Sequence, residues 1–198
     1  ESALHLGLDP GAGAMLMIES DAGGEVAARE LDTAAEACRA AGATTLDRAT
    51  DPDEADAMRE ARRKAHWSLQ QLGQARTEDV SVPRSRVAEF IDEVARISRE
   101  HEMMIGVFGH AGDGHFHPAY VTGHDDPRAE ERTDAVRADL YTAVLALGGT
   151  ITGEHGTGLT KRDFLEQQFG TRGVAAMRAI KDALDPDGIL NPGKVLPD

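Results

Sequence analysis

Residues 109–118, GHAGDGHFHP, decide the fold that we expect for this chain. They join two apolar runs that are typical of β-strands, Met103–Phe108 and Phe116–Val121. An Asp-Gly pair between two strands is a strong signal for a two-residue hairpin, because the type I′ turn needs a positive φ at both central positions. We therefore predict that the two runs pair as an antiparallel hairpin around Asp113 and Gly114.

This hairpin would gather three histidine side chains on one face. With Asp113 and Gly114 in the turn, His110 lies opposite His117, and opposed residues share a face with Cβ atoms roughly 5 Å apart. His115 shares that face too, because strand side chains alternate. Neutral imidazoles around a divalent cation are a common arrangement for such a cluster, so the pattern predicts a metal site. Surface or structural histidines are the alternative, and a one-residue shift of the turn would break the pairing.

The sequence on both sides of the hairpin alternates helix and strand signals. After Pro83, apolar residues recur at helical intervals and mark an amphipathic helix. Further helices are predicted at Gly24–Ala41, Pro52–Leu72, Pro127–Leu147, Lys161–Phe169 and Arg172–Leu184, and further strands at Ala14–Glu19, Thr44–Asp47, Val80–Val82 and Thr150–Thr152. The fold class that fits is α+β, a mainly antiparallel sheet with helices packed mainly on one face. The tail Asp185–Asp198 is expected to be irregular.

A second concentration of polar residues lies at 152–158, TGEHGTG, where three glycines indicate a tight loop. On a regular strand, Glu154 and His155 would point to opposite faces, but the flanking glycines allow the backbone to turn both toward one site. Glu154 would then be an oxygen ligand that completes a His/His/Glu metal site with histidines of the hairpin, leaving one position open. His155 would be the general base, since the pKa of histidine begins near neutral pH. A surface loop is the alternative.

Composition limits the classes of partner. The 198 residues carry 35 acidic and 21 basic side chains, a formal net charge of −14, which argues against nucleic acid and anionic membranes as partners. Cys38 is the single cysteine, so an intrachain disulfide and a cysteine metal cluster are excluded. No apolar run reaches the roughly 20 residues of a membrane span. A reducing, cytoplasmic location is the simplest expectation.

Three ordered motifs carry a resemblance to a known family. They are Gly-His-Ala-Gly-Asp-Gly followed two residues later by His117, then Gly-Glu-His-Gly, and finally Asn191-Pro192-Gly193-Lys194. Together they resemble the C-terminal domain of FAD-linked oxidases, with the flavin subunit of glycolate oxidase and the D-lactate dehydrogenases as the nearest relatives. The resemblance covers about Ala14 to Leu196.

The resemblance implies a domain organisation and a fold. Residues 1–198 would form the C-terminal domain, with a ferredoxin-like α+β cap core at 14–160 and C-terminal helices and a flavin-facing tail at 161–198. An N-terminal FAD-binding domain would precede it. That domain is absent from this sequence, in which no dinucleotide glycine fingerprint occurs.

The resemblance also assigns roles to residues. The family's metal ligands match His110, His117 and Glu154, and its catalytic base matches His155. Asn191 matches a region that returns to the flavin. Arg63, or Arg62 beside it, lies where the family often keeps an arginine for the substrate carboxylate, although a solvated helix face explains this basic run equally well.

One position departs from the family pattern. The family commonly has Asn where this chain has His115, with Leu or Met next, and Phe116 follows here. His115 would contact the substrate in place of Asn, or would add a metal ligand. The departure leaves the identity of the substrate open.

The function implied is that of the substrate- and metal-binding half of an FAD-dependent 2-hydroxy-acid dehydrogenase, inactive without its flavin. The divalent metal would be zinc, with manganese or iron as alternatives. The expected partners are a small 2-hydroxy acid and an iron–sulfur or other electron-acceptor subunit, and a homodimer is compatible with the sequence. Two other classes remain: a stand-alone metal-binding or regulatory module, and a metal-dependent hydrolase with Glu154 as base.

Overall fold

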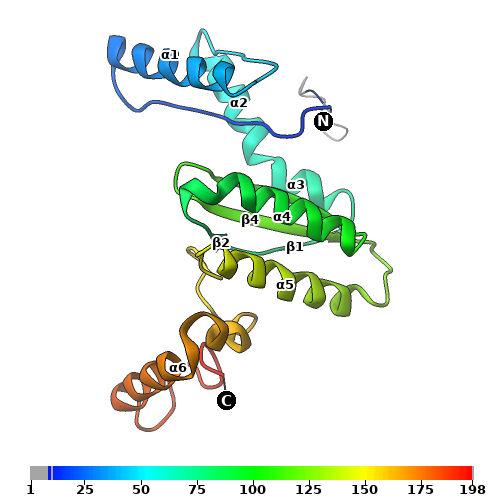
Figure 1. Cartoon of the computed structure of the whole chain (residues 1–198), viewed down its shortest axis with the longest axis vertical. Helices are drawn as coiled ribbons and strands as arrows, with labels where there is room; N and C mark the ends of the chain where they lie inside the picture. Colours follow the sequence, from blue (N-terminus) through cyan, green and yellow to red (C-terminus); the bar gives the residue numbers. More distant parts are fainter. Residues whose placement is uncertain (1–8, 10, 198) are drawn as a thin grey trace. The chain divides into compact units, whose positions relative to one another are not determined.

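The chain divides between Ser68 and Leu69 into two units. We describe it from a computed structural model that covers residue 9 and residues 11–197 (Figure 1). The boundary differs from the division at 160/161 implied by the family resemblance, which stays a prediction. Each unit is described by itself below.

The first unit is helical. It contains α1 (Gly24–Ala40) and α2 (Pro52–Arg63), and α3 (Ala65–Gln70) begins in it. The side chain of Asp51 accepts a hydrogen bond from the Glu54 amide at 2.9 Å and caps the start of α2. The single helix predicted at 52–72 is therefore two helices, because the first ends at Arg63.

The two strands predicted in the first unit, Ala14–Glu19 and Thr44–Asp47, are wrong. Neither segment is a strand in the structure, and the apolar run Met15–Ile18 is exposed. A strand satisfies its backbone groups by pairing with another strand, and the described part of this unit contains none. An apolar run therefore does not predict a strand reliably when no second strand can pair with it.

The second unit is built on a four-stranded antiparallel sheet. Its strands are β1 (Gln74–Thr77), β2 (Val80–Ser81), β3 (Met104–His110) and β4 (His115–Thr122). The strand β4 is central: β1 and β2 pair with successive parts of it, and β3 pairs with almost its whole length. The strand β1 was missed by the sequence analysis, and the strand predicted at Thr150–Thr152 is reduced to a single bridge between Thr150 and Ser81.

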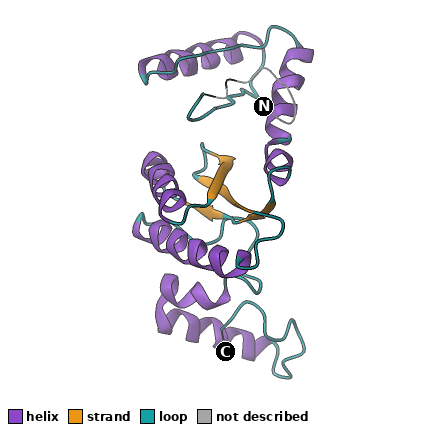
Figure 2. Ribbon diagram, turned by 90° about the vertical axis from the view of Figure 1, so that its right-hand side faces the viewer, coloured by secondary structure: helices purple, strands orange, loops and turns teal. Residues whose placement is uncertain are grey.

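Two helices cover one face of this sheet (Figure 2). They are α4 (Val87–Glu100), which follows a short 3-10 turn at Arg84–Arg86, and α5 (Ala129–Ala146). The apolar stripe of α4 buries Phe90, Val94 and Ile97, as its helical spacing predicted. These side chains join a core with residues of the sheet and of α5, including Val80, Phe116, Tyr120, Val136, Leu140, Tyr141 and Val144. The predicted α+β class, with an antiparallel sheet and helices, is confirmed.

The hairpin forms, but its predicted register is wrong. His110 pairs with His115, and His117 pairs with Phe108, so the connection has four residues instead of two. Gly114 has a φ of 72°, whereas a type I′ turn needs a positive φ at both central residues, and Asp113 does not have one. The register differs by two residues, which leaves every side chain on its predicted face.

Gly114 is expected to be required for this connection. Its φ is positive, a conformation that side chains rarely adopt. A Cβ at this position would also clash with the backbone carbonyl of Val82, and Val82 cannot move without disturbing β2, which directly precedes it. Gly114→Ala should therefore lower the free energy of unfolding by about 2–4 kcal/mol, measured by urea unfolding followed by circular dichroism. Gly112→Ala is the matched control, because a Cβ at Gly112 has no neighbour within 4 Å. Equal stability of the two variants would contradict this account.

The C-terminal part begins with a 3-10 turn at Arg162–Phe164 and continues in α6 (Leu165–Leu184). Non-helical angles at Gly170, φ 68° and ψ 166°, break α6 near its start, where the sequence predicted the gap between two helices. The described residues of the tail, 185–197, form no helix or strand, as predicted. Among the described residues, no helix combines the length and the apolar character that a bilayer span requires.

Candidate functional site

The site is built where the central strand meets the glycine-rich loop at 152–158. His115 and His117 lie on the same face of β4, since they are two residues apart, and their ring centroids are 4.7 Å apart. The ring of His155 stacks on that of His117 at 5.2 Å with an interplanar angle of 23°. Strand alternation and the loop thus bring three imidazoles together.

Glu154 lies between two of these rings. Its Oε1 atom is 3.7 Å from His117 Nε2 and 3.6 Å from His155 Nε2. One ligand atom from each of His117, Glu154 and His155 lies within 4.8 Å of the others. Two imidazoles and a carboxylate are a donor set that suits zinc or a related divalent metal, so the residues present fit a metal ion.

The surroundings of His117 favour its neutral form, which is the form that binds a metal. Burial lowers its pKa, and the neighbouring His115 lowers it further, against the opposing effect of a backbone contact with Glu78. The Glu78 carbonyl oxygen lies 3.3 Å from Nδ1. Because a carbonyl only accepts, Nδ1 carries the hydrogen and Nε2 keeps its lone pair on the side of Glu154. Such an outer contact fixes the tautomer of metal-binding histidines.

The remaining predicted residues are placed differently. His110 is exposed, and its ring lies 5.9 Å from that of His115; among the described residues, it belongs to neither of the two groups that could hold a metal. Arg63 lies in the first unit and pairs with Glu60 at 2.9 Å. Asn191, with a φ of 45°, lies in the tail. The backbone of Val195 ties this tail to the glycine-rich loop through the carbonyl of Gly158 at 2.8 Å.

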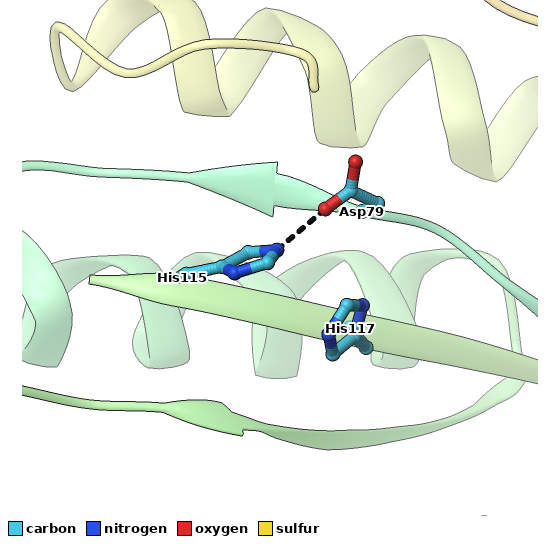
Figure 3. Close-up of side chains that lie close together, drawn as sticks. All are labelled: Asp79, His115 and His117. Carbon is cyan, nitrogen blue, oxygen red and sulfur yellow. Dashed lines mark hydrogen bonds and ion pairs between the residues drawn. The ribbon is translucent and has the colours of Figure 1, made fainter. Parts of the chain in front are cut away.

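Sequence reasoning missed one residue at the centre of the site, Asp79. It follows β1 and precedes β2, and its side chain is 1% exposed. Figure 3 shows its carboxylate beside His115, with Oδ1 2.5 Å from His115 Nε2. Its Oδ2 accepts hydrogen bonds from the amides of Gly153 and His155, each at 2.9 Å. The only signal in the sequence was a pair of acidic residues before an apolar strand.

Asp79 is ionised despite its burial. Burial on its own raises the pKa of a carboxyl group, but the hydrogen bonds from His155, His115 and Glu154, together with the charge of Lys161, hold the pKa of Asp79 well below its usual range. Asp79, His115 and His117 form a second group whose ligand atoms are close enough to hold a metal. Its oxygens are already occupied by these donors, so the group containing Glu154 is the better candidate.

The neighbouring Glu78 is buried and bonds to residues of α5. Its Oε1 accepts a hydrogen bond from Arg137 Nε at 2.7 Å, and its Oε2 accepts one from the hydroxyl of Tyr141. Glu78 is 4% exposed and Arg137 is 8% exposed. This buried pair fixes the segment that carries Asp79 against α5.

A cavity of about 400 Å³ adjoins His155. The basic residues Arg76, Arg137 and Lys161 line it, together with the acidic residues Glu78 and Asp79 and residues 156–158. Of these cations, Arg137 and Lys161 are paired with carboxylates of Glu78 and Asp79. The cavity is large enough for a small organic acid, and its lining beside the imidazole carries both positive and negative charge.

Comparison with known proteins gives consistent matches. A sequence model of the family "FAD linked oxidases, C-terminal domain" matches residues 1–195. The chain is 38% identical over 196 residues to the glycolate oxidase subunit GlcD of Bacillus subtilis, covering 98% of this chain and 42% of that protein. It is 36% identical over 159 residues to the mitochondrial D-lactate dehydrogenase [cytochrome] of Kluyveromyces lactis, covering 77% and 27%. The chain therefore spans less than half of the length of these relatives.

Proposed function

The chain belongs to the family of FAD-linked oxidase C-terminal domains, and from this premise we propose that it is the substrate- and metal-binding part of an FAD-dependent 2-hydroxy-acid dehydrogenase. The reaction would oxidise the α-hydroxyl of glycolate, D-lactate or a similar acid to a carbonyl. Two observations support the proposal: the similarity to a glycolate oxidase subunit and to a D-lactate dehydrogenase, and the clustering of His117, Glu154 and His155. The proposed chemistry depends mainly on this cluster.

We propose that a divalent metal, zinc in the first instance, binds at this cluster. His117 and Glu154 would be ligands, and the third would be His110, as the family pattern implies, or His155, whose Nε2 lies 3.6 Å from Glu154. A bound metal would act as a Lewis acid that polarises the substrate hydroxyl. Burial lowers the pKa of His117 and so favours the neutral form that a ligand needs, which supports this assignment.

The acid–base work is assigned to His155. Its side chain is 56% exposed, and it lines the cavity beside the cluster, so a substrate hydroxyl can reach it. His155 would accept the hydroxyl proton, while FAD, when bound, supplies the acceptor for the hydride. The family pattern implies that Arg63 would hold the substrate carboxylate by two parallel hydrogen bonds.

Two further residues keep the roles that the family pattern implies. His115 would contact the substrate from the position where the family commonly has Asn, and its Nε2 atom is paired with Asp79. Asn191 would lie toward the flavin from the tail. The whole enzyme would hold FAD on an N-terminal domain and pass electrons to an iron–sulfur or other acceptor subunit.

The metal assignment is tested on the purified chain by titration with Zn²⁺. The wild type is expected to bind one equivalent, and His117→Ala should weaken binding by more than about 100-fold, since loss of a ligand exceeds the roughly 10–100-fold effect of losing a supporting contact. His124→Ala, an exposed histidine in a loop, is the control. Comparing His110→Ala with His155→Ala identifies the third ligand. A wild-type chain that binds no metal would contradict the assignment.

The activity is tested in the longer protein that includes an FAD-binding domain. Glycolate, D-lactate and D-2-hydroxyglutarate are supplied in turn with an artificial electron acceptor, and oxidation of one of them is expected. Metal binding without oxidation of any 2-hydroxy acid would favour a stand-alone metal-binding module instead.

A further inference from the structure

We propose that Asp79 is the positioning residue of the site: its carboxylate holds the glycine-rich loop in the bend that turns Glu154 and His155 toward the same point. This inference rests on the proposed function for its catalytic meaning, because it concerns the same two residues. Its structural part stands on hydrogen bonds alone.

The first argument is the number of donors that converge on one carboxylate. Backbone amides of three consecutive residues, Gly153, Glu154 and His155, donate to Asp79 Oδ2 at 2.9, 3.1 and 2.9 Å. The hydroxyl of Thr152 donates to the same oxygen at 3.1 Å. Successive amides that point at one anion form a concave nest, an arrangement that requires a bent backbone. Asp79 thus supplies the anion around which this loop is folded.

The second argument is geometric. Neighbouring side chains of an extended strand point to opposite faces, so Glu154 and His155 cannot serve one site on a regular strand. In the structure their side chains approach to 3.6 Å, and the backbone there is a bend. The amides of these two residues donate to Asp79, while their side chains approach each other. The bend and its anion explain how adjacent residues meet at one site.

The third argument is that Asp79 joins both halves of the site. Its Oδ1 lies 2.5 Å from Nε2 of His115 on β4, next to His117 on the same face. Lys161 Nζ donates to the Asp79 backbone carbonyl at 2.6 Å and lies 3.5 Å from Oδ2, which balances the buried negative charge. A Cβ at Gly153 would meet both the ring of His115 and the carboxylate of Asp79. The packing leaves room for glycine only.

Asp79→Asn is the primary test, because it keeps the size of the side chain and removes its charge and one acceptor. Amide hydrogen exchange followed by NMR on the isotope-labelled chain is expected to show protection at residues 153–155 in the wild type. In Asp79→Asn this protection should fall by roughly 10- to 100-fold, while amides of β4 and α5 keep theirs. Asp125→Asn, which changes an exposed loop aspartate, is the control. Unchanged protection at 153–155 would overturn the proposal.

A second variant covers the case in which Asp79→Asn does not fold. Gly153→Ala leaves every charge in place and inserts a methyl group between the loop and the Asp79–His115 pair, so it should reduce the same protection. Titration with Zn²⁺ then links positioning to function: Asp79→Asn is expected to bind the ion about 10- to 100-fold more weakly at unchanged stoichiometry.

The outcomes separate the two proposals. If the wild type binds no Zn²⁺ but Asp79→Asn still loses protection at residues 153–155, the metal assignment fails and the positioning role stands. If the wild type and Asp79→Asn bind Zn²⁺ equally well and show equal protection, the positioning role fails and the metal assignment stands. Complete loss of one binding equivalent in Asp79→Asn would make Asp79 a ligand, which also overturns the positioning role.

Discussion

His155→Ala is expected to lower kcat of the FAD-loaded protein toward its 2-hydroxy acid by roughly 10²–10⁴-fold, the usual contribution of a placed general base. The substrate would still be held by contacts that His155 does not make, so KM should change little. Its ring lies on the open side of the cluster, stacked on His117 and lining the cavity. The substitution therefore removes a proton acceptor without creating a cavity in the core. Steady-state kinetics with an artificial electron acceptor measure both constants.

His124→Ala is the control for this prediction. His124→Ala removes an exposed imidazole outside the cluster and should leave kcat unchanged. If His155 is a metal ligand instead of the base, its replacement should weaken Zn²⁺ binding to the same extent as His117→Ala does. An unaltered kcat in His155→Ala would refute both roles.

Local patterns predicted the parts of the fold that local interactions determine. The apolar stripe on α4 predicted its buried face, because one side of a helix is set by the spacing of its own residues. The break near Gly170 was also visible, since glycine tolerates the non-helical angles found there. Both features depend on residues fewer than about five positions apart.

The register of the hairpin could not be predicted from local patterns alone. Asp-Gly predicted a two-residue turn, but in the structure the Gly114 carbonyl oxygen accepts a hydrogen bond at 2.8 Å from the amide of Val82, the residue that follows β2. That third segment is part of what fixes the connection, and no pattern within 109–118 contains it. His110, His115 and His117 stayed on one face only because the error in register was an even number of residues.

The centre of the site could not be found from spacing at all. Asp79 meets His115 across 36 positions and the His155 amide across 76. The motifs contained Glu154 and His155, to which we assign chemical roles, but not the carboxylate that accepts hydrogen bonds from their amides. That contact is defined by the tertiary fold and not by any spacing within a motif.

The buried pair of Glu78 and Arg137 is expected to give the largest loss of stability of any single polar change described. Glu78→Leu would leave Arg137 in the core with only the partly exposed Asp134 as a partner, and Arg137→Met would leave the Glu78 carboxylate with the hydroxyl of Tyr141 alone. Breaking one side of a buried pair costs about 3–5 kcal/mol, because an uncompensated charge stays buried. Urea unfolding followed by circular dichroism measures the difference.

The double variant Glu78→Leu with Arg137→Met should be more stable than either single variant, because replacing both charges by apolar groups of similar volume is often neutral or better. Additive losses would show that the pair does not act as a unit. The exposed pair of Arg86 and Glu89 is the matched comparison, with an effect below about 1 kcal/mol. Because Glu78 directly precedes Asp79 in the chain, the double variant also tests whether the pair affects metal binding. If it folds but binds Zn²⁺ weakly, the pair maintains the position of Asp79 rather than the stability of the fold.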